Sequence, residues 1–219
     1  MLNREAAPLR AGAVAAIRLA IVEGTYPAGS RLKEKELEQS LGVSRTVIRE
    51  ALRQLESERL VRIQPNVGPV VVQLTERDVV DLYEIRAVVE SAAGRLAASE
   101  GNETEIAGVR AAFEAIAGAD ARSLQDLVCL KNSFYSSLFA ASHNPILEQF
   151  HVNVQSRISQ LRAVTLQTPG RMTDTVQELR RVVEAIEAGR PHQASEACLA
   201  HVNAARAIAV RHFNEHPNK

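Results

Sequence analysis

The hydrophobic period of this sequence changes from helical to extended within its first 75 residues, and this change restricts the fold more than any other feature. Apolar residues recur at helical spacing in three short segments, and Gly24 and Gly42 end the first two. After Leu60, two extended runs flank a turn of Pro, Asn, Val and Gly. Three short helices and a two-stranded ribbon predict a winged helix-turn-helix. The predicted helices span 9–23, 34–41 and 45–58, and the predicted strands span 61–64 and 69–73.

Beyond Thr75 the strand signals disappear, and helical patterns broken by Gly, Asn and Pro continue to the C-terminus. The composition suits packed helices, because 46% of the residues are hydrophobic, 4% are aromatic and Trp is absent. We therefore expect a mainly α protein, with a winged helix-turn-helix domain at 1–75 and an all-α helical bundle at 76–219. Helices of the bundle are expected at 75–99, 103–118, 122–142, 146–166, 172–188 and 191–213.

The 219-residue chain has a formal net charge of zero, but its charges are unevenly distributed. Residues 1–75 contain 11 Lys and Arg against 8 Asp and Glu, whereas residues 76–219 contain 15 against 18. A mildly basic N-terminal part joined to a mildly acidic C-terminal part is compatible with one domain that faces DNA.

The two cysteines, Cys129 and Cys198, are too few for a disulfide framework. Both lie among apolar helical residues, so we expect them to be small buried hydrophobic side chains with reduced thiols. No apolar run reaches the roughly 18 residues that a membrane span requires, and the N-terminus lacks a signal-peptide pattern. These observations predict a cytoplasmic protein with no membrane partner.

The third predicted helix carries two arginines on one side. Arg45 and Arg49 are one turn apart, Thr46 shares the first turn, and Ser44 is a good N-cap. Arginine can bond guanine O6 and N7 in a bidentate manner, and the hydroxyls and free amides at a helix start suit phosphate oxygens. The alternative interpretation is a solvated face with no ligand. The position of the helix, before a predicted wing, favours a major-groove recognition helix.

The same part of the sequence resembles the GntR family of bacterial regulators, in the stretch Arg31–Leu37 and in its continuation Leu41–Leu52. Two later stretches, Asp81–Arg86 and Ala197–His201, resemble the C-terminal FCD domain of the family's FadR branch. The resemblance covers almost the whole chain. It implies that Arg45 and Arg49 read bases, that other residues hold the DNA backbone, and that the wing tip enters the minor groove. The implied DNA-binding residues are Lys35, Ser44, Arg45, Thr46, Arg49, Asn66 and Gly68.

Many FCD domains hold a divalent metal with one Asp and three His, and this chain departs from that pattern. The resemblance aligns the Asp position with Lys131, and two of the His positions with Tyr135 and Leu179. Only His201 remains of the set. An ammonium, a phenol and an aliphatic side chain are poor partners for a divalent cation, so we expect no metal and no cofactor.

The residues that replace the metal ligands suggest a different effector site. On the 122–142 helix, Lys131 and Tyr135 belong to an inward-facing stripe, and an unpaired buried Lys would be costly. We expect Lys131 to substitute for the metal and to bind an anionic effector with Tyr135 and His201. Arg86 and Arg157 also lie among apolar residues and are further candidate carboxylate partners. The alternative is an internal ion pair, for example of Lys131 or Arg86 with Glu90. The other histidines, His143, His151, His192, His212 and His216, are interpreted mostly as surface residues.

The function that these features favour is sequence-specific DNA binding in transcription regulation. We expect a homodimer on a pseudo-palindromic operator, acting as the repressor of a metabolic operon and released by a small organic acid. An alternative is a dimeric DNA-binding protein without an effector. An enzyme with a Schiff base on Lys131 is a third reading, but no phosphate loop, nucleophile elbow or acid–base pair accompanies that lysine, so we expect no enzyme.

Overall fold

The structure is a computed structural model, and it describes residues 6–119 and 123–215 of the chain. The described residues form two compact units, of which the first ends at Thr75 and the second begins at Glu76. The predicted helix start at residue 122 lies outside the described residues. So do the first five residues of the predicted domain 1–75 and the last four of the predicted domain 76–219. Among the described helices, none combines the length and the apolar character that crossing a bilayer requires.

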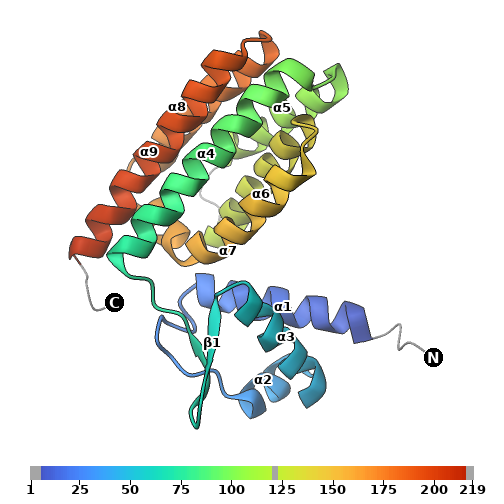
Figure 1. The fold of residues 1–219 in the computed structure, drawn as a ribbon, viewed down its shortest axis with the longest axis vertical. Helices are drawn as coiled ribbons and strands as arrows, with labels where there is room; N and C mark the ends of the chain where they lie inside the picture. Colours follow the sequence, from blue (N-terminus) through green and yellow to red (C-terminus); the bar gives the residue numbers. More distant parts are fainter. Residues whose placement is uncertain (1–5, 120–122, 216–219) are drawn as a thin grey trace. The chain divides into compact units, whose positions relative to one another are not determined.

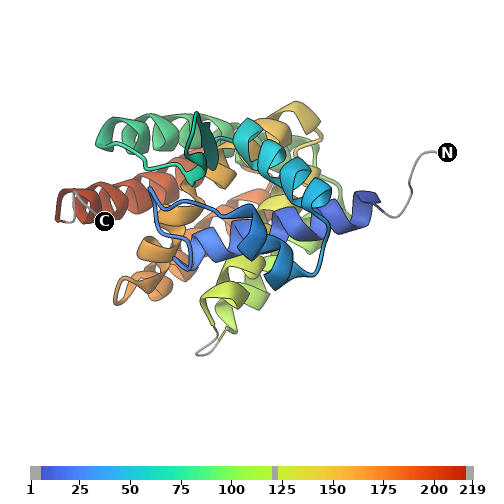
Figure 2. The ribbon, with the colours of Figure 1, turned by 90° about the horizontal axis from the view of Figure 1, so that it is seen from below.

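The first unit begins with three helices, α1 (Ala6–Val22), α2 (Glu34–Leu41) and α3 (Arg45–Ser57). α1 and α3 pack against each other, with α2 beside α3 (Figure 1, Figure 2). Their core is aliphatic, and Ile17, Ile48 and Leu55 are almost completely buried in it. Gly42 ends α2 in the left-handed region with φ of 64°, and its N–H bonds the carbonyl of Glu38. This conformation suits glycine, so the tight turn between α2 and α3 follows from the sequence.

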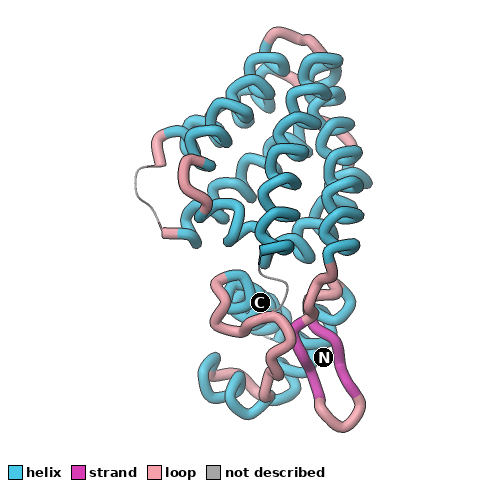
Figure 3. Tube along the Cα trace, turned by 90° about the vertical axis from the view of Figure 1, so that its left-hand side faces the viewer, coloured by secondary structure: helices cyan, strands magenta, loops and turns pink. Residues whose placement is uncertain are grey.

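A short antiparallel ribbon of β1 (Val61–Gln64) and β2 (Gly68–Val71) completes the first unit (Figure 3). Asn66 in the connecting turn and Gly68 at the start of β2 both have positive φ, at 62° and 96°. These conformations are open to Asn and Gly at low cost, which explains the reversal at this point of the chain. Three helices and a ribbon confirm the predicted winged helix-turn-helix, and β2 lies within two residues of its predicted limits.

The second unit is built only of helices in the described residues (Figure 1). α4 packs along most of its length against α9 and also contacts α6, α7 and α8. The predicted mainly α fold is therefore confirmed, with each helix close to its predicted limits. The helices are α4 (Glu76–Glu100), α5 (Glu103–Ala117), α6 (Leu124–Ala141), α7 (Pro145–Gln167), α8 (Arg171–Glu187) and α9 (Pro191–Glu215).

The contact of α4 with α9 depends on a residue without a side chain. A Cβ added at Gly94 would lie 2.6 Å from the Sγ of Cys198 and 3.1 Å from the carbonyl oxygen of Ala194, so the two backbones approach closely here. Burial raises the pKa of the Cys198 thiol far above its usual range, as expected for a small core residue. The expectation of burial is wrong for Cys129, which is exposed.

Candidate functional site

The first turn of α3 presents polar side chains on one side and buries its apolar residues on the other. Ser44 is the N-cap, and its hydroxyl accepts a hydrogen bond from the backbone N–H of Val47 at 3.4 Å. Arg45, Thr46 and Arg49 are exposed. The opposite face is buried because its apolar residues recur at helical spacing. That buried set is Val47, Ile48, Ala51, Leu52 and Leu55.

A carboxylate from α2 joins the two exposed arginines, which the sequence did not predict. The Nε of Arg45 lies 2.9 Å from the Oε2 of Glu34, and the Nε of Arg49 lies 3.1 Å from the same oxygen. Glu38 is also near, at 3.8 Å from the Nε of Arg45. Burial works to raise the pKa of the Glu34 carboxyl, but the hydrogen bonds from Arg45 and Arg49 outweigh it and lower the pKa.

The remaining expected DNA contacts lie on α2 and the ribbon. Lys35 is exposed on the first turn of α2, immediately after Glu34. Asn66 is exposed at the turn, and Gly68 is partly buried at the start of β2. All seven of the expected DNA-binding residues therefore lie in the first unit, five of them on or beside α2 and α3 and two at the tip of the ribbon.

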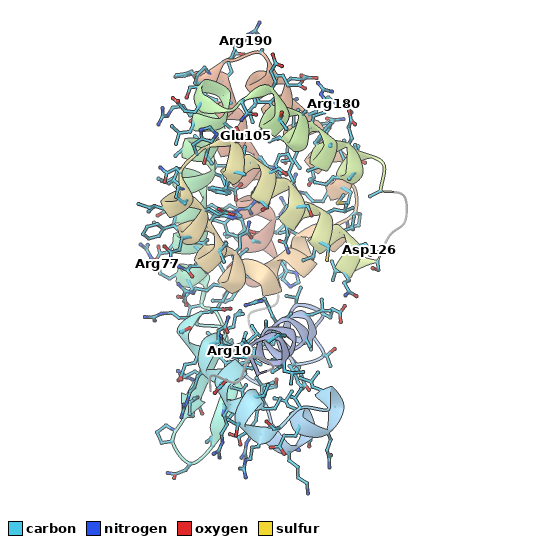
Figure 4. All side chains as sticks on the ribbon, turned by 90° about the vertical axis from the view of Figure 1, so that its right-hand side faces the viewer. Arg10, Arg77, Glu105, Asp126, Arg180 and Arg190 are labelled. Atoms are coloured by element: carbon cyan, nitrogen blue, oxygen red, sulfur yellow. The ribbon has the colours of Figure 1, made fainter. Side chains whose placement is uncertain are left out.

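A second polar cluster lies inside the helical unit. Charged side chains such as Arg77 and Arg190 project from the outside of this unit (Figure 4), whereas Arg86 and Glu90 are only 2% and 1% exposed. Arg86 and Glu90 form an ion pair one turn apart on α4. Burial works to raise the pKa of Glu90, but Arg86 and His151 outweigh it and hold the pKa well below its usual range. The internal ion pair of Arg86 with Glu90, which the sequence offered as the alternative to effector binding, is therefore present.

Hydrogen bonds extend this cluster across three more helices. The Nη2 of Arg86 donates to the hydroxyl oxygen of Tyr135 on α6 at 2.5 Å. The Tyr135 hydroxyl lies 3.2 Å from the Nε2 of His201 on α9, and the Nδ1 of His201 lies 2.6 Å from Glu178 on α8. These distances fit a neutral imidazole that accepts from Tyr135 at Nε2 and donates to Glu178 from Nδ1. Arg171 also bonds Glu178, at 2.6 Å.

The surroundings of His201 favour its neutral form. Burial and, to a smaller extent, the charges of Lys131 and Arg86 together lower the pKa of His201 to about 4, against the opposing hydrogen bond to Glu178. Burial works to raise the pKa of Glu178, but its hydrogen bonds with His201 and Arg171 outweigh this and lower the pKa to about 2. The cluster therefore combines ionised Arg and Glu side chains with an uncharged imidazole near pH 7.

Two more side chains border this cluster, one of them expected. Lys131 is 7% exposed, and its Nζ lies 6.0 Å from the centroid of the Tyr135 ring. His151 on α7 is 5% exposed, so its interpretation as a surface residue is wrong. Its ring centroid lies 4.8 Å from that of Tyr135, and its Nε2 lies 3.5 Å from Glu90. His216 lies outside the described residues.

Arg157 does not join the other candidate effector residues. It is partly exposed on α7, and its Nη2 lies 3.3 Å from the Oδ1 of Asp78, so a carboxylate of the protein already pairs with it. Asp78 precedes Arg86 by eight residues, or about 12 Å along a helix. The structure thus brings Arg86, Lys131, Tyr135 and His201 together and leaves Arg157 about two turns away.

Four residues of this chain align with the metal ligands of other FCD domains, and they do not fit a divalent cation. They are Lys131, Tyr135, Leu179 and His201. Lys131 supplies a cationic head, Leu179 is a buried aliphatic side chain, and both ring nitrogens of His201 already have protein partners. Divalent metals need several free nitrogen, oxygen or thiolate donors at one point. Within residues 6–119 and 123–215, no three His, Cys, Asp or Glu side chains come together in a way that could hold a metal ion.

Comparison with known proteins covers both units. The chain matches the model of bacterial regulatory proteins, gntR family, over residues 9–71, and the FCD domain model over residues 81–204. The uncharacterized HTH-type transcriptional regulator YdhC of Bacillus subtilis (strain 168) is 31% identical over 185 residues, which cover 84% of this chain and 83% of that protein. A protein of Paenarthrobacter nicotinovorans, named as a probable D-xylose utilization operon transcriptional repressor, is 32% identical over 200 residues. These residues cover 90% of this chain and 87% of that protein.

A solved structure shares the fold along nearly the whole chain. E. coli McbR/YncC superposes with a TM-score of 0.82 at 20% sequence identity, covering 94% of this chain and 99% of that one. The two family models match consecutive segments of the chain, and the two relatives align with it across both segments. The chain therefore belongs to the gntR family of bacterial regulatory proteins, with an FCD domain after its winged helix-turn-helix, and it is a DNA-binding transcription regulator rather than an enzyme.

Proposed function

We propose that this regulator is a cytoplasmic repressor of a metabolic operon, which binds a pseudo-palindromic operator as a homodimer and leaves it when a small carboxylate binds the FCD domain. The observation that carries the DNA-binding part is the pair of exposed arginines on the capped first turn of α3. The name of the Paenarthrobacter relative, which refers to repression of a sugar utilization operon, supports repression of a metabolic operon.

Arg45 and Arg49 are the proposed base readers. Both lie within the first two turns of α3, the part of a recognition helix that meets base edges in the major groove. A bidentate contact of arginine with guanine contributes about 1–3 kcal/mol of discrimination against another base. Ser44, Thr46 and Lys35 surround this point and are proposed to contact phosphates, while Asn66 and Gly68 form the wing tip proposed to reach the adjacent minor groove.

Replacing these arginines tests the assignment of the base readers. Arg45→Ala and Arg49→Ala should each abolish specific retention of an operator fragment in a gel shift, because each loses base contacts while its helix remains capped. Arg53→Ala is the matched control, since Arg53 is also exposed on α3 but lies one turn beyond Arg49. Undiminished specific retention by both Arg45→Ala and Arg49→Ala would refute the assignment.

The interior cluster of the FCD domain is the proposed effector site. Lys131 offers an ammonium beside the phenol of Tyr135. A ligand carboxylate can accept a hydrogen bond from the Lys131 ammonium and a second one from the Tyr135 hydroxyl, whose single proton then turns from His201 to the ligand. Arg86 is already paired with Glu90, so its proposed role is to hold the hydroxyl of Tyr135 in place. Without a ligand, His201 accepts the proton of the same hydroxyl from the other side. This arrangement supports recognition of an organic acid without a metal.

A thermal-shift screen of organic acids and acyl-CoAs tests this part of the proposal. At least one acid should raise the melting temperature of the full chain and weaken operator retention at the same concentration, since a ligand that binds the folded state stabilises it. Lys131→Met should remove the stabilisation, while Lys33→Met, at an exposed site in the other unit, should keep it. The proposal fails if no acid stabilises the chain, or if Lys131→Met responds like the wild type.

A homodimer is proposed because one recognition helix reads only a short half-site, and a two-fold dimer reads two of them about one DNA turn apart. Exposed apolar side chains on α4 and α7 support a place for the second copy. Val88 is 68% exposed, and Ile85, Ile146 and Phe150 are 49%, 65% and 57% exposed. Monomeric proteins rarely leave such side chains exposed in one patch.

Helical geometry indicates that Ile85 of α4 and Phe150 of α7 lie on the same side of this helix pair. Asp78 on α4 pairs with Arg157 on α7. Residues seven apart point in nearly the same direction on a helix, so Ile85 lies on the stripe of Asp78 and Phe150 on the stripe of Arg157. The ion pair therefore aligns the two stripes along the seam between the helices.

A further inference from the structure

The carboxylate of Glu34 lies between the two arginines that are proposed to read bases. Both arginines donate from Nε, at 2.9 Å and 3.1 Å from the same Oε2 of Glu34. The side chain of Glu34 is 23% exposed, whereas those of Arg45 and Arg49 are 64% and 54% exposed. Glu34 is the more enclosed partner and belongs to the start of α2, so it provides a fixed point for two otherwise mobile cations.

The atoms involved decide what the arginines can still do. A guanidinium carries five N–H groups in a planar fork, and the Nε–H lies on its inner side. A carboxylate that holds Nε leaves the outer pair of Nη groups directed away from it. That outer edge is suited to the O6 and N7 acceptors of guanine. The contact with Glu34 is therefore compatible with base reading, and it limits the directions in which each guanidinium can turn.

The same carboxylate opposes binding to phosphates. Together, Glu34, Arg45 and Arg49 carry a net charge of +1, whereas the two arginines alone would carry +2. Sequence-independent affinity grows with the number of phosphates that Lys and Arg neutralise. A fixed negative charge beside both arginines weakens phosphate contacts, while contacts with base edges meet neutral acceptors.

We propose that Glu34 is a specificity-determining positioning residue, which holds Arg45 and Arg49 by their Nε atoms for base contact and restrains them from binding phosphates at random. The proposal rests on the proposed base-reading role of the two arginines and adds to it. Glu34 acts through the arginines and touches no base itself. Its loss should leave the affinity for DNA in general high and the discrimination between sequences low.

The test compares one selected duplex with a scrambled duplex of the same composition. The full-length wild type first selects its preferred sequence from a random pool, and Kd is then measured for both duplexes at several salt concentrations. Glu34→Gln keeps the shape of the side chain and removes its charge. Glu36→Gln makes the same charge change two residues away, where the carboxylate is 59% exposed and pairs with Lys33 at 2.7 Å.

For Glu34→Gln we expect the scrambled duplex to bind about 3–10-fold more tightly than it binds the wild type. The plot of log K against log salt concentration should become steeper by about one unit of slope, because about one more phosphate is neutralised. The ratio of the two Kd values should fall by about tenfold, whereas Glu36→Gln should keep that ratio within about twofold of the wild type. Since each ratio is taken within one protein sample, a smaller folded fraction cancels from it.

Two outcomes overturn the proposal while leaving base reading by the arginines intact. In the first, the ratio of the two Kd values for Glu34→Gln equals that of the wild type. In the second, this ratio falls equally in Glu34→Gln and Glu36→Gln. A different result would show that Arg45 and Arg49 are not the base readers. If Arg49→Ala and Arg45→Ala both keep the wild-type ratio, the arginines do not read bases, and the proposed role of Glu34 falls with them.

Discussion

His201 shows how a single residue can link the stability of the FCD domain to pH. The pKa of its imidazole is lowered to about 4 in the folded chain, against an ordinary value of 6.5. Between these values the unfolded chain binds a proton that the folded chain does not, so stability falls as the pH falls from 6.5 towards 4. The shift corresponds to a loss on the order of 3 kcal/mol. Glu178 adds to the loss only at lower pH, because its pKa falls from 4.5 to about 2 on folding.

Urea unfolding of the full chain at pH 7 and pH 5 measures this effect. His201→Gln should reduce the difference in unfolding free energy between the two pH values, since the amide cannot take up the proton. His192→Gln is the control, because His192 is an exposed histidine on the same helix. An unchanged pH difference in His201→Gln would contradict the buried neutral imidazole.

The sequence predicted some residues of the interior site and missed others for geometric reasons. Lys131 and Tyr135 were predicted to face inward by their spacing on one helix, and both are buried. Cys129 precedes Lys131 by two residues, about 200° around the helix, so burial of one places the other outside. Glu178 reaches His201 from another helix, and nothing in the sequence indicates which of the many Glu residues does so.

The residues that follow His151 indicate that its side chain is buried. Val154 and Ile158 follow it at three and seven residues, which is the spacing of one buried helical face, and both are buried with it. Histidines are often exposed, and that general tendency favoured the wrong interpretation. Local periodicity is therefore the better guide for a lone histidine in a helix.

Among the elements, α3 depends on a cap whose hydroxyl is also a proposed DNA contact, and two substitutions separate these roles. Ser44→Ala removes the acceptor for the Val47 N–H and should cost about 1 kcal/mol of stability. Ser44→Asp restores the cap and adds a negative charge where phosphate is expected, so stability should stay close to the wild type while affinity for DNA falls by about tenfold or more.

Thermal unfolding and operator titration of both variants provide the readings. Equal operator affinity of Ser44→Asp and wild type would show that Ser44 does not lie near a phosphate. A stability of Ser44→Ala equal to that of the wild type would show that the cap contributes nothing to α3.

The limits of the elements were predictable because their ends carry local chemistry. Ser44, Asn102 and Asn144 accept hydrogen bonds from the first turns of α3, α5 and α7, and Gly42 ends α2. These signals act within a few residues of each helix end. The contact of Glu34 with α3 crosses 11 and 15 residues of sequence, and no local rule predicts such a pairing.

At the scale of the whole molecule, the proposed dimer makes Phe150 and Val152 a matched pair for substitution. Phe150→Glu places a charge on the proposed face and should raise the dimer dissociation constant by about 100-fold or more, because an unpaired charge becomes buried. Val152→Glu makes a similar change two residues away, about 200° around α7, at a side chain that is 55% exposed, and should leave the dimer intact. Analytical ultracentrifugation distinguishes the species. A dimeric Phe150→Glu, or dissociation of both variants, would rule out this face.

Selection of binding sites from a random duplex pool tests whether the proposed dimer reads DNA sequence through Arg45 and Arg49. The wild type should enrich a pseudo-palindromic consensus whose half-sites lie about one DNA turn apart, with guanines at the positions that the arginines meet. Arg45→Ala and Arg49→Ala should each fail to enrich this consensus, as expected from their loss of specific operator retention. Failure of the wild type to enrich any sequence, or an unchanged consensus in both variants, would contradict this role of the two arginines.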